Sequence, residues 1–349
     1  MKAILLIYNP KAGDTTFRFS LDRFIEIFSK KAYEIRIFRS CRPGDMAEYL
    51  LQADLTSVGA IMVAGGTGTV SEVVGAVVGQ KIDLPVGIIP AGTENELAKY
   101  LGFTGDLEEN LKALYEMHEG RVDVGKIGDQ YFVDLCGAGT FSSISNVSTD
   151  IRTAFGKIAS YMKGAVSFQK LKSRKLYIET GGKRYIGTFS SFIAANEALY
   201  RDGSLSEGTL TFVATRGNML GGEGKYLGKD YQDEHDTAHL HDNHGVGEIE
   251  KGVLRLVGTE FKIEAESDDP LPMEIDGESG LMQLPMTITV LPAALRVFYS
   301  PEGRDALFLK KRKAKEAEDK AQLKKAIKKE MKKEQKAKKQ GKRKKKKTA

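Results

Sequence analysis

The sequence predicts an N-terminal α/β domain with a parallel sheet, followed by a domain that consists mainly of antiparallel β-strands. Before residue 102, apolar runs lead three times into a glycine- or proline-containing turn and then a helical pattern, as in βα units. From residue 123 onward, segments of alternating apolar and polar residues are separated by Gly and Asp turns, which is typical of antiparallel strands. A chain of 349 residues with 41% hydrophobic content is long enough to form both domains.

The first apolar run, residues 2–8, predicts a buried central strand that ends in a turn. The turn residues are Asn9, Pro10, Lys11, Ala12 and Gly13. A helix is expected next, because apolar residues follow at helical spacing. Residues 33–39 then alternate like a strand, and Ser40 precedes a helix that extends to residue 51. Asp45 fits the N-cap position of that helix.

Two further units carry the most distinctive turns. The apolar run 61–64 leads into Gly65, Gly66, Thr67, Gly68 and Thr69, and the run 86–89 leads into a turn that contains Thr93, Glu94, Asn95 and Glu96. Backbone N–H groups at the start of a helix bind phosphate oxygens, and the helix dipole adds to the attraction. The alternative is a tight βα turn without a ligand. Thr69 and Glu72 also have the spacing of a capping box.

The second domain is expected to hold eight β segments and one helix, at residues 151–171. The β segments are residues 122–127, 130–136, 175–180, 183–194, 209–215, 252–257, 260–266 and 285–297. We place the domain boundaries at 1–122, 123–300 and 301–349, with strand exchange between the first two near residues 295–300. The active site is expected in the cleft between them. Within residues 216–250, His235 and His239 have a metal-ligand spacing, although a solvated loop is the favoured interpretation.

The two turns carry a resemblance to a known family. The segments GGTGTVSEVVGAV (65–77) and GIIPAGTENELAKYLG (87–102) resemble the paired signature GGDGTxxEV and PxGTxNDxA of the diacylglycerol kinase catalytic-domain family. That family includes bacterial lipid kinases and sphingosine kinases, with NAD kinases as distant relatives. The resemblance is strong over residues 1–145 and looser over 151–300. It implies a lipid kinase with ATP and Mg²⁺ as cofactors and a lipid hydroxyl as acceptor.

The resemblance also implies roles for individual residues. Glu278 would be the catalytic base, and Asp276 and Glu96 would organise Mg²⁺. A structural Mg²⁺ would be held by Ser204, Glu207 and Thr209. The nucleotide would be held by the first turn, by both glycine-containing turns and by nearby polar groups: Asn9, Pro10, Lys11, Ala12, Gly13, Ser40, Gly65, Gly66, Thr67, Gly68, Thr69, Glu72, Thr93 and Asn95.

Thr67 departs from the family pattern, which has aspartate at this position. Threonine neither accepts a proton at neutral pH nor holds Mg²⁺ as an anion, and loss of a general base costs roughly 10²–10⁴-fold in rate. Glu94 is our candidate to restore the missing charge from the neighbouring turn. The alternative function is a family member that binds nucleotide or lipid without efficient turnover.

The charge is divided unevenly along the chain. Residues 310–349 contain 21 Lys/Arg and 5 Asp/Glu, a net charge of +16, whereas the 309 residues before them have a net charge of −10. We expect the tail to contact an anionic membrane surface rather than nucleic acid, because no aromatic residue follows Phe308. A solvated tail is the other alternative, and a homodimer is left open.

The remaining features bear on the compartment. Two cysteines cannot form a disulfide framework, which favours a reducing compartment. The apolar start is too short for a signal-peptide core, and no run approaches the ~18 apolar residues of a bilayer span. We therefore expect a cytoplasmic protein with peripheral membrane association.

Overall fold

The computed structural model describes residues 2–12, 17–30, 33–91, 96–139, 174–200, 203–216, 247–250, 253–267, 269–276, 278–310 and 312–313. The predicted helix at 151–171 and the segment with His235 and His239 lie outside these ranges. No helix within them is long and apolar enough to span a bilayer.

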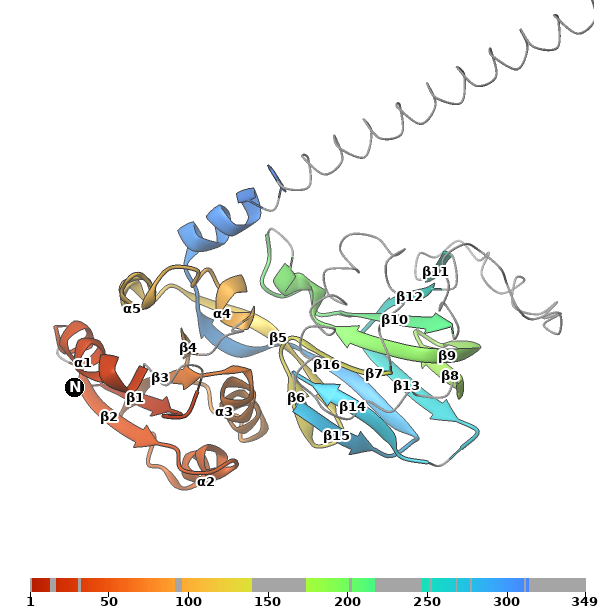
Figure 1. Ribbon diagram of the computed structural model, residues 1–349, viewed down its shortest axis with the longest axis horizontal. Helices are drawn as coiled ribbons and strands as arrows, with labels where there is room; N and C mark the ends of the chain where they lie inside the picture. The colour runs from red at the N-terminus through yellow and green to blue at the C-terminus, as the bar shows by residue number, and fades with distance from the viewer. Residues whose placement is uncertain are drawn as a thin grey trace, which may run out of the picture.

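The first part of the chain is a parallel sheet in the order β4-β3-β1-β2, as predicted. Its strands are β1 (Ala3–Tyr8), β2 (Glu34–Arg39), β3 (Val58–Gly65) and β4 (Val86–Pro90). Helices α1 (Leu21–Ser29) and α5 (Leu107–Glu116) lie on one face, and α2 (Asp45–Gln52) and α3 (Thr67–Gly79) on the other (Figure 1). Strand β1 is buried at all six positions because it is central and covered on both faces.

The second part is mainly antiparallel, also as predicted. Its strands are β5 (Glu119–Ile127), β6 (Gln130–Phe132), β7 (Leu135–Gly139), β8 (Arg174–Thr180), β9 (Lys183–Ala195), β10 (Leu210–Arg216), β11 (Gly247–Glu250), β12 (Val253–Gly258), β13 (Glu260–Ala265), β14 (Leu271–Ile275), β15 (Glu278–Met282) and β16 (Met286–Phe298). A second apolar core, separate from the first, fills this part; Phe192, Phe212 and Phe261 stack in it.

Strand β16 joins the two parts into one continuous sheet. Its first half pairs with β13, both halves pair with β5, and near its end Val297 pairs in parallel with Val86 of β4. The side chains of Leu295, Val297 and Phe298 accordingly belong to the first core, not the second. A bulge separates the two halves, and Ala293 has a positive φ of 49° there.

The predicted strand at residues 130–136 is wrong. Residues 130–136 are not one strand, because β6 ends at Phe132 and β7 begins at Leu135. The backbone N–H groups of Val133, Asp134 and Leu135 donate to the carboxylate of Asp276 instead of to a neighbouring strand. A side chain more than 130 residues away therefore breaks the strand, and no local pattern reports it.

Candidate functional site

The turn that follows β1 and the glycine turn that follows β3 (residues 65–69) lie together at the carboxyl ends of the parallel strands. Asn9 follows β1, and its Nδ2 donates to Oγ1 of Thr69 in α3 at 3.2 Å. Its Oδ1 accepts a hydrogen bond from the backbone N–H of Lys11 at 2.9 Å, which closes the first turn on itself. Ser40 follows β2 and is buried, with its backbone N–H bonded to the carbonyl of Tyr8. These turns thus form one surface at the sheet edge where ligands of such folds bind.

The three glycines of the glycine turn have different surroundings. A side-chain carbon on Gly65 would overlap the side chain of Thr69, and one on Gly68 would overlap the carboxylate of Glu278. At Gly66, by contrast, a Cβ would meet nothing within 4 Å. Helix α3 begins at Thr67, and its N-cap residue is Gly66, which has no side chain to cap the helix. The helix N-terminus beside Gly66 therefore has room for an anionic group.

The capping predictions around α2 and α3 are wrong. Thr69 lies inside α3 rather than at its N-cap, and Gly44 rather than Asp45 is the N-cap of α2. Glu72 caps α2 from a distance, since its Oε1 accepts the N–H groups of Met46 and Ala47 at 2.9 and 3.2 Å. This position of the signature thus fixes α2 against α3.

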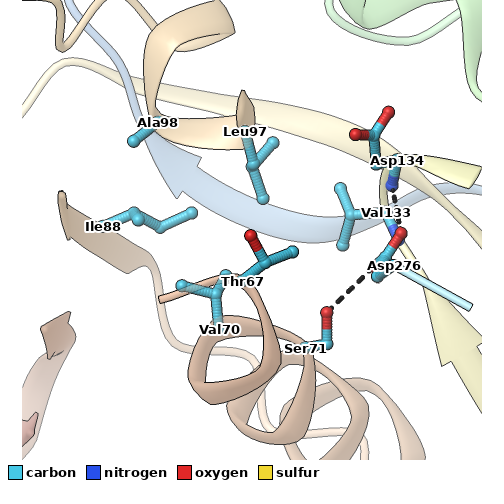
Figure 2. Close-up of a pocket in the computed structure, with 9 residues that line it drawn as sticks. All are labelled: Thr67, Val70, Ser71, Ile88, Leu97, Ala98, Val133, Asp134 and Asp276. Atoms are coloured by element: carbon cyan, nitrogen blue, oxygen red, sulfur yellow. Dashed lines mark hydrogen bonds between the residues drawn. The ribbon is translucent and has the colours of Figure 1, made fainter. Parts of the chain in front are cut away.

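A largely apolar cavity lies where the two parts of the chain meet (Figure 2). Its volume is small in this conformation, about 20 Å³ of space for the centre of a water-sized molecule. The N-terminal part contributes Thr67, Val70, Ser71, Ile88, Leu97 and Ala98, and the β-rich part contributes Val133, Asp134 and Asp276. Figure 2 shows the Thr67 hydroxyl directed into this cavity, towards Leu97 of helix α4 (Glu96–Tyr100). Thr67, the residue that departs from the family signature, therefore faces the cavity directly.

Asp276 connects the two parts beside the cavity. It is 3% exposed, and both carboxylate oxygens are fully engaged. Oδ1 accepts the N–H groups of Asp134 and Leu135 at 2.9 and 3.0 Å, and Oδ2 accepts that of Val133 at 2.8 Å. Ser71 of α3 donates its hydroxyl to Oδ2 at 3.0 Å. Burial raises the pKa of Asp276, whereas these four donors oppose that shift.

Ser71 is a site residue that the sequence reasoning missed. It lies four residues after Thr67 in α3, so the two side chains share one face of the helix and both line the cavity. That spacing was the available signal.

Two other acids in the β14–β15 hairpin differ sharply from Asp276. Glu278 is exposed, and its carboxylate lies against Gly68 of the glycine turn. Glu274 is 3% exposed, and its Oε2 has no hydrogen-bond partner among the described residues. Burial raises the pKa of Glu274 to about 7. Asp276 is thus saturated with donors, Glu274 is buried on β14, and Glu278 alone reaches the glycine turn.

The contact between α3 and the β-rich part is close. The ring of Tyr131 in β6 packs on two glycines of α3, and a Cβ on Gly79 would lie only 3.3 Å from its Cε2. Gly75, one turn earlier, faces the same ring. This packing, together with the Ser71–Asp276 hydrogen bond, fixes α3 relative to the hairpin that carries Glu278.

The expected structural metal site has a different organisation. Asp123, fully buried, accepts the N–H groups of Glu207 and Gly208 at 2.9 and 2.8 Å, and the hydroxyl of Ser206. It also accepts the N–H of Ala293 at the β16 bulge. Ser204 is engaged with Ser206, and the side chain of Glu207 is exposed. Within the described part of the chain, no group of three or more His, Cys, Asp or Glu side chains could hold a metal ion.

Several predicted site residues cannot be placed. Gly13, Thr93, Glu94 and Asn95 lie outside the described residues, and the same is true of the side chain of Glu96. The proposed compensation of Thr67 by Glu94 therefore stays a prediction.

Comparisons with known proteins agree with the fold. The diacylglycerol kinase catalytic domain, as a family, matches residues 3–127. A diacylglycerol kinase of Bacillus subtilis (strain 168) is 30% identical over 219 residues, 60% of this chain and 72% of that protein. A diacylglycerol kinase of Staphylococcus carnosus (strain TM300) is 26% identical over 309 residues, 86% of this chain and 96% of that protein.

A solved structure shares the fold. The crystal structure of a diacylglycerol kinase from Bacillus anthracis str. Sterne superposes with a TM-score of 0.61 at 21% identity, covering 86% of this chain and 98% of that one. The matched region includes both the parallel sheet and the β-rich part that complete the cavity. The chain belongs to the diacylglycerol kinase catalytic-domain family.

Proposed function

We propose that this protein is an ATP-dependent lipid kinase that transfers the γ-phosphoryl group to the hydroxyl of a diacylglycerol-like or sphingoid-like lipid. The observation that carries this proposal is the position of Glu278 against Gly68, beside an apolar cavity. A phosphate-binding turn, a carboxylate and an apolar wall are what phosphoryl transfer to a lipid hydroxyl requires. Family membership supports the same activity.

The phosphates of ATP would lie at the N-terminus of α3. The open space at Gly66, the N-cap residue of α3, supports this placement. Asn9 holds Thr69 in place below the turn. The predicted contacts of Thr93 and Asn95 would come from the neighbouring turn and belong to the same proposal.

Glu278 would act as the general base. It would take the proton of the lipid hydroxyl while that oxygen forms a bond to the γ-phosphorus and the bond from phosphorus to the bridging oxygen of ADP breaks. Mg²⁺, when bound, neutralises charge on the phosphates. Glu96 remains the candidate to organise that ion. We assign Asp276 a positioning role instead, because its four donors leave no lone pair for a metal.

One observation favours a second candidate function. Thr67 lines the cavity where the family signature has aspartate, so a neutral hydroxyl faces the cavity. The second candidate is a protein that binds nucleotide or lipid on a kinase scaffold without efficient turnover.

The proposal includes peripheral association with an anionic membrane from the cytoplasmic side. The described start of the basic tail is exposed: Lys310 ends a helix at 301–310, and Arg312 and Lys313 come after it (Figure 1). Each basic residue near an anionic bilayer contributes about 1 kcal/mol to binding.

The test is ADP release from Mg-ATP in the presence of anionic vesicles that contain diacylglycerol or a sphingoid base. Lipid-dependent turnover by the unaltered chain supports the kinase. Turnover that begins only in Thr67→Asp supports the second candidate. If neither chain turns over although both bind ATP, the kinase proposal is wrong for these lipid classes.

A further inference from the structure

Helix α4 is short, and its carboxyl end is completed by unusual partners. The last carbonyls of a helix have no partner within it. After α4, Gly102 has a φ of +94°, its N–H donates to the carbonyl of Lys99, and the N–H of Phe103 donates to that of Ala98. This is a Schellman motif, and it leaves the carbonyls of Tyr100 and Leu101 to be satisfied from elsewhere.

The helix at 301–310 and the residue before it supply the two missing donors. The backbone N–H of Ser300 donates to the carbonyl of Leu101 at 2.7 Å, and the guanidinium of Arg304 donates to the carbonyl of Tyr100. Ser300 also begins the helix, since its Oγ accepts the N–H of Gly303 at 3.1 Å. The two backbones touch here, because a Cβ on Gly303 would overlap the carbonyl of Gly102.

Arg304 reaches the β-rich part as well. It is 5% exposed, its second terminal nitrogen donates to the carbonyl of Gly203 at 3.4 Å, and its Cζ lies 5.1 Å from the centre of the Phe308 ring. A cation at a helix carboxyl end also complements the helix dipole. One buried side chain thus ties the end of α4 to the loop that Asp123 holds.

We propose that Arg304 is a positioning residue for the cavity. Helix α4 has only five residues, and two of them, Leu97 and Ala98, line the cavity. So short a helix depends on tertiary contacts for its position. Loss of the guanidinium releases the carboxyl end of α4, so the side of the cavity that α4 forms is no longer held in position. Acceptor binding is then weakened, although no reacting group is removed. This inference rests on the proposed function only in naming the lipid as the ligand.

The experiment compares the full chain with Arg304→Met and Arg304→Lys. Methionine keeps an apolar stem but removes the donors, whereas lysine still donates to one carbonyl. Hydrogen exchange at the amides of residues 101–103 should quicken about tenfold or more in Arg304→Met and less in Arg304→Lys. The KM for the lipid acceptor should rise about tenfold in Arg304→Met, with kcat within about threefold.

The matched control is Arg296→Met, which removes a guanidinium bonded to the backbone carbonyl of Asp83 and to the carboxylate of Glu119. It should leave residues 101–103 and the acceptor KM unchanged. Unchanged exchange in Arg304→Met overturns the proposal, and so does faster exchange with an unchanged acceptor affinity. A fluorescent diacylglycerol analogue reads that affinity in a chain without turnover, so failure of the kinase proposal and failure of this one remain separate.

Discussion

Asp276 and Glu278 stand two residues apart in one hairpin, and their surroundings are opposite. Asp276 is buried and accepts four hydrogen bonds from protein donors, one of them from α3 in the other part of the chain. Glu278 is exposed and lies against the glycine turn. The difference separates two tasks that the sequence pattern alone merges. Asp276 holds the hairpin in place, and Glu278 presents a carboxylate to the site.

The largest effect is expected when the carboxylate of Glu278 is removed, which tests its role as the general base. Glu278→Gln should lower lipid-dependent turnover by about 10²–10⁴-fold, because the amide does not accept the acceptor's proton. Its unfolding free energy should stay within about 0.5 kcal/mol of the unaltered chain, since the side chain is exposed. ADP release and urea denaturation on the same preparation measure both. Full activity in Glu278→Gln would remove the base from this residue.

The structural role of Asp276 predicts a smaller change in turnover, and a larger change in the free energy of unfolding, than the role of Glu278 does. Asp276→Asn turns an oxygen acceptor into an amide donor that faces existing donors, so the free energy of unfolding should fall by about 1–3 kcal/mol. Urea denaturation measures the change, with Glu278→Gln as the matched exposed control. Equal stability of the two variants would contradict the division of tasks.

A third acid sharpens the comparison through pH. The pKa of Glu274 is about 7 in the folded protein because of burial, whereas the unfolded chain ionises near 4.5. Folding therefore favours the protonated form, so its contribution is complete below pH ~4.5 and is lost as pH rises to about 7. The loss amounts to a few kcal/mol at most, at 1.36 kcal/mol per pH unit. Denaturation at pH 4.5 and 7.5 should show this decline in the unaltered chain but not in Glu274→Gln; an identical decline in both would assign it to other groups.

The sequence predicts the parts of the molecule that local patterns encode. Apolar periodicity and glycine turns locate β1, β3, β4 and α3, because each element and its turn are adjacent in the chain. The family signature adds Glu278, and the structure lays it against Gly68.

Contacts between distant segments account for what the sequence could not predict. The break after β6 is made by Asp276, the cap of α2 comes from Glu72, and the end of α4 is completed by Arg304. Ser300 and Pro301, an N-cap residue before proline, were a visible sign that a helix begins there. The packing of the helix at 301–310 against α4 is not indicated by any local sequence pattern.

In the proposed kinase, the glycine turn binds phosphate at Gly66 while Glu278 acts above Gly68. The most direct measurement is Mg-ATP affinity and kcat for Gly66→Ala and Gly68→Ala, matched substitutions two residues apart. Gly66→Ala fills open space, so it should weaken ATP binding about tenfold and leave kcat at saturation nearly unchanged. Gly68→Ala displaces the Glu278 carboxylate, so it should keep ATP affinity and lower kcat at least tenfold. If the two variants lose the same quantity, or if Gly68→Ala keeps full kcat, the phosphate and the base do not meet at this turn.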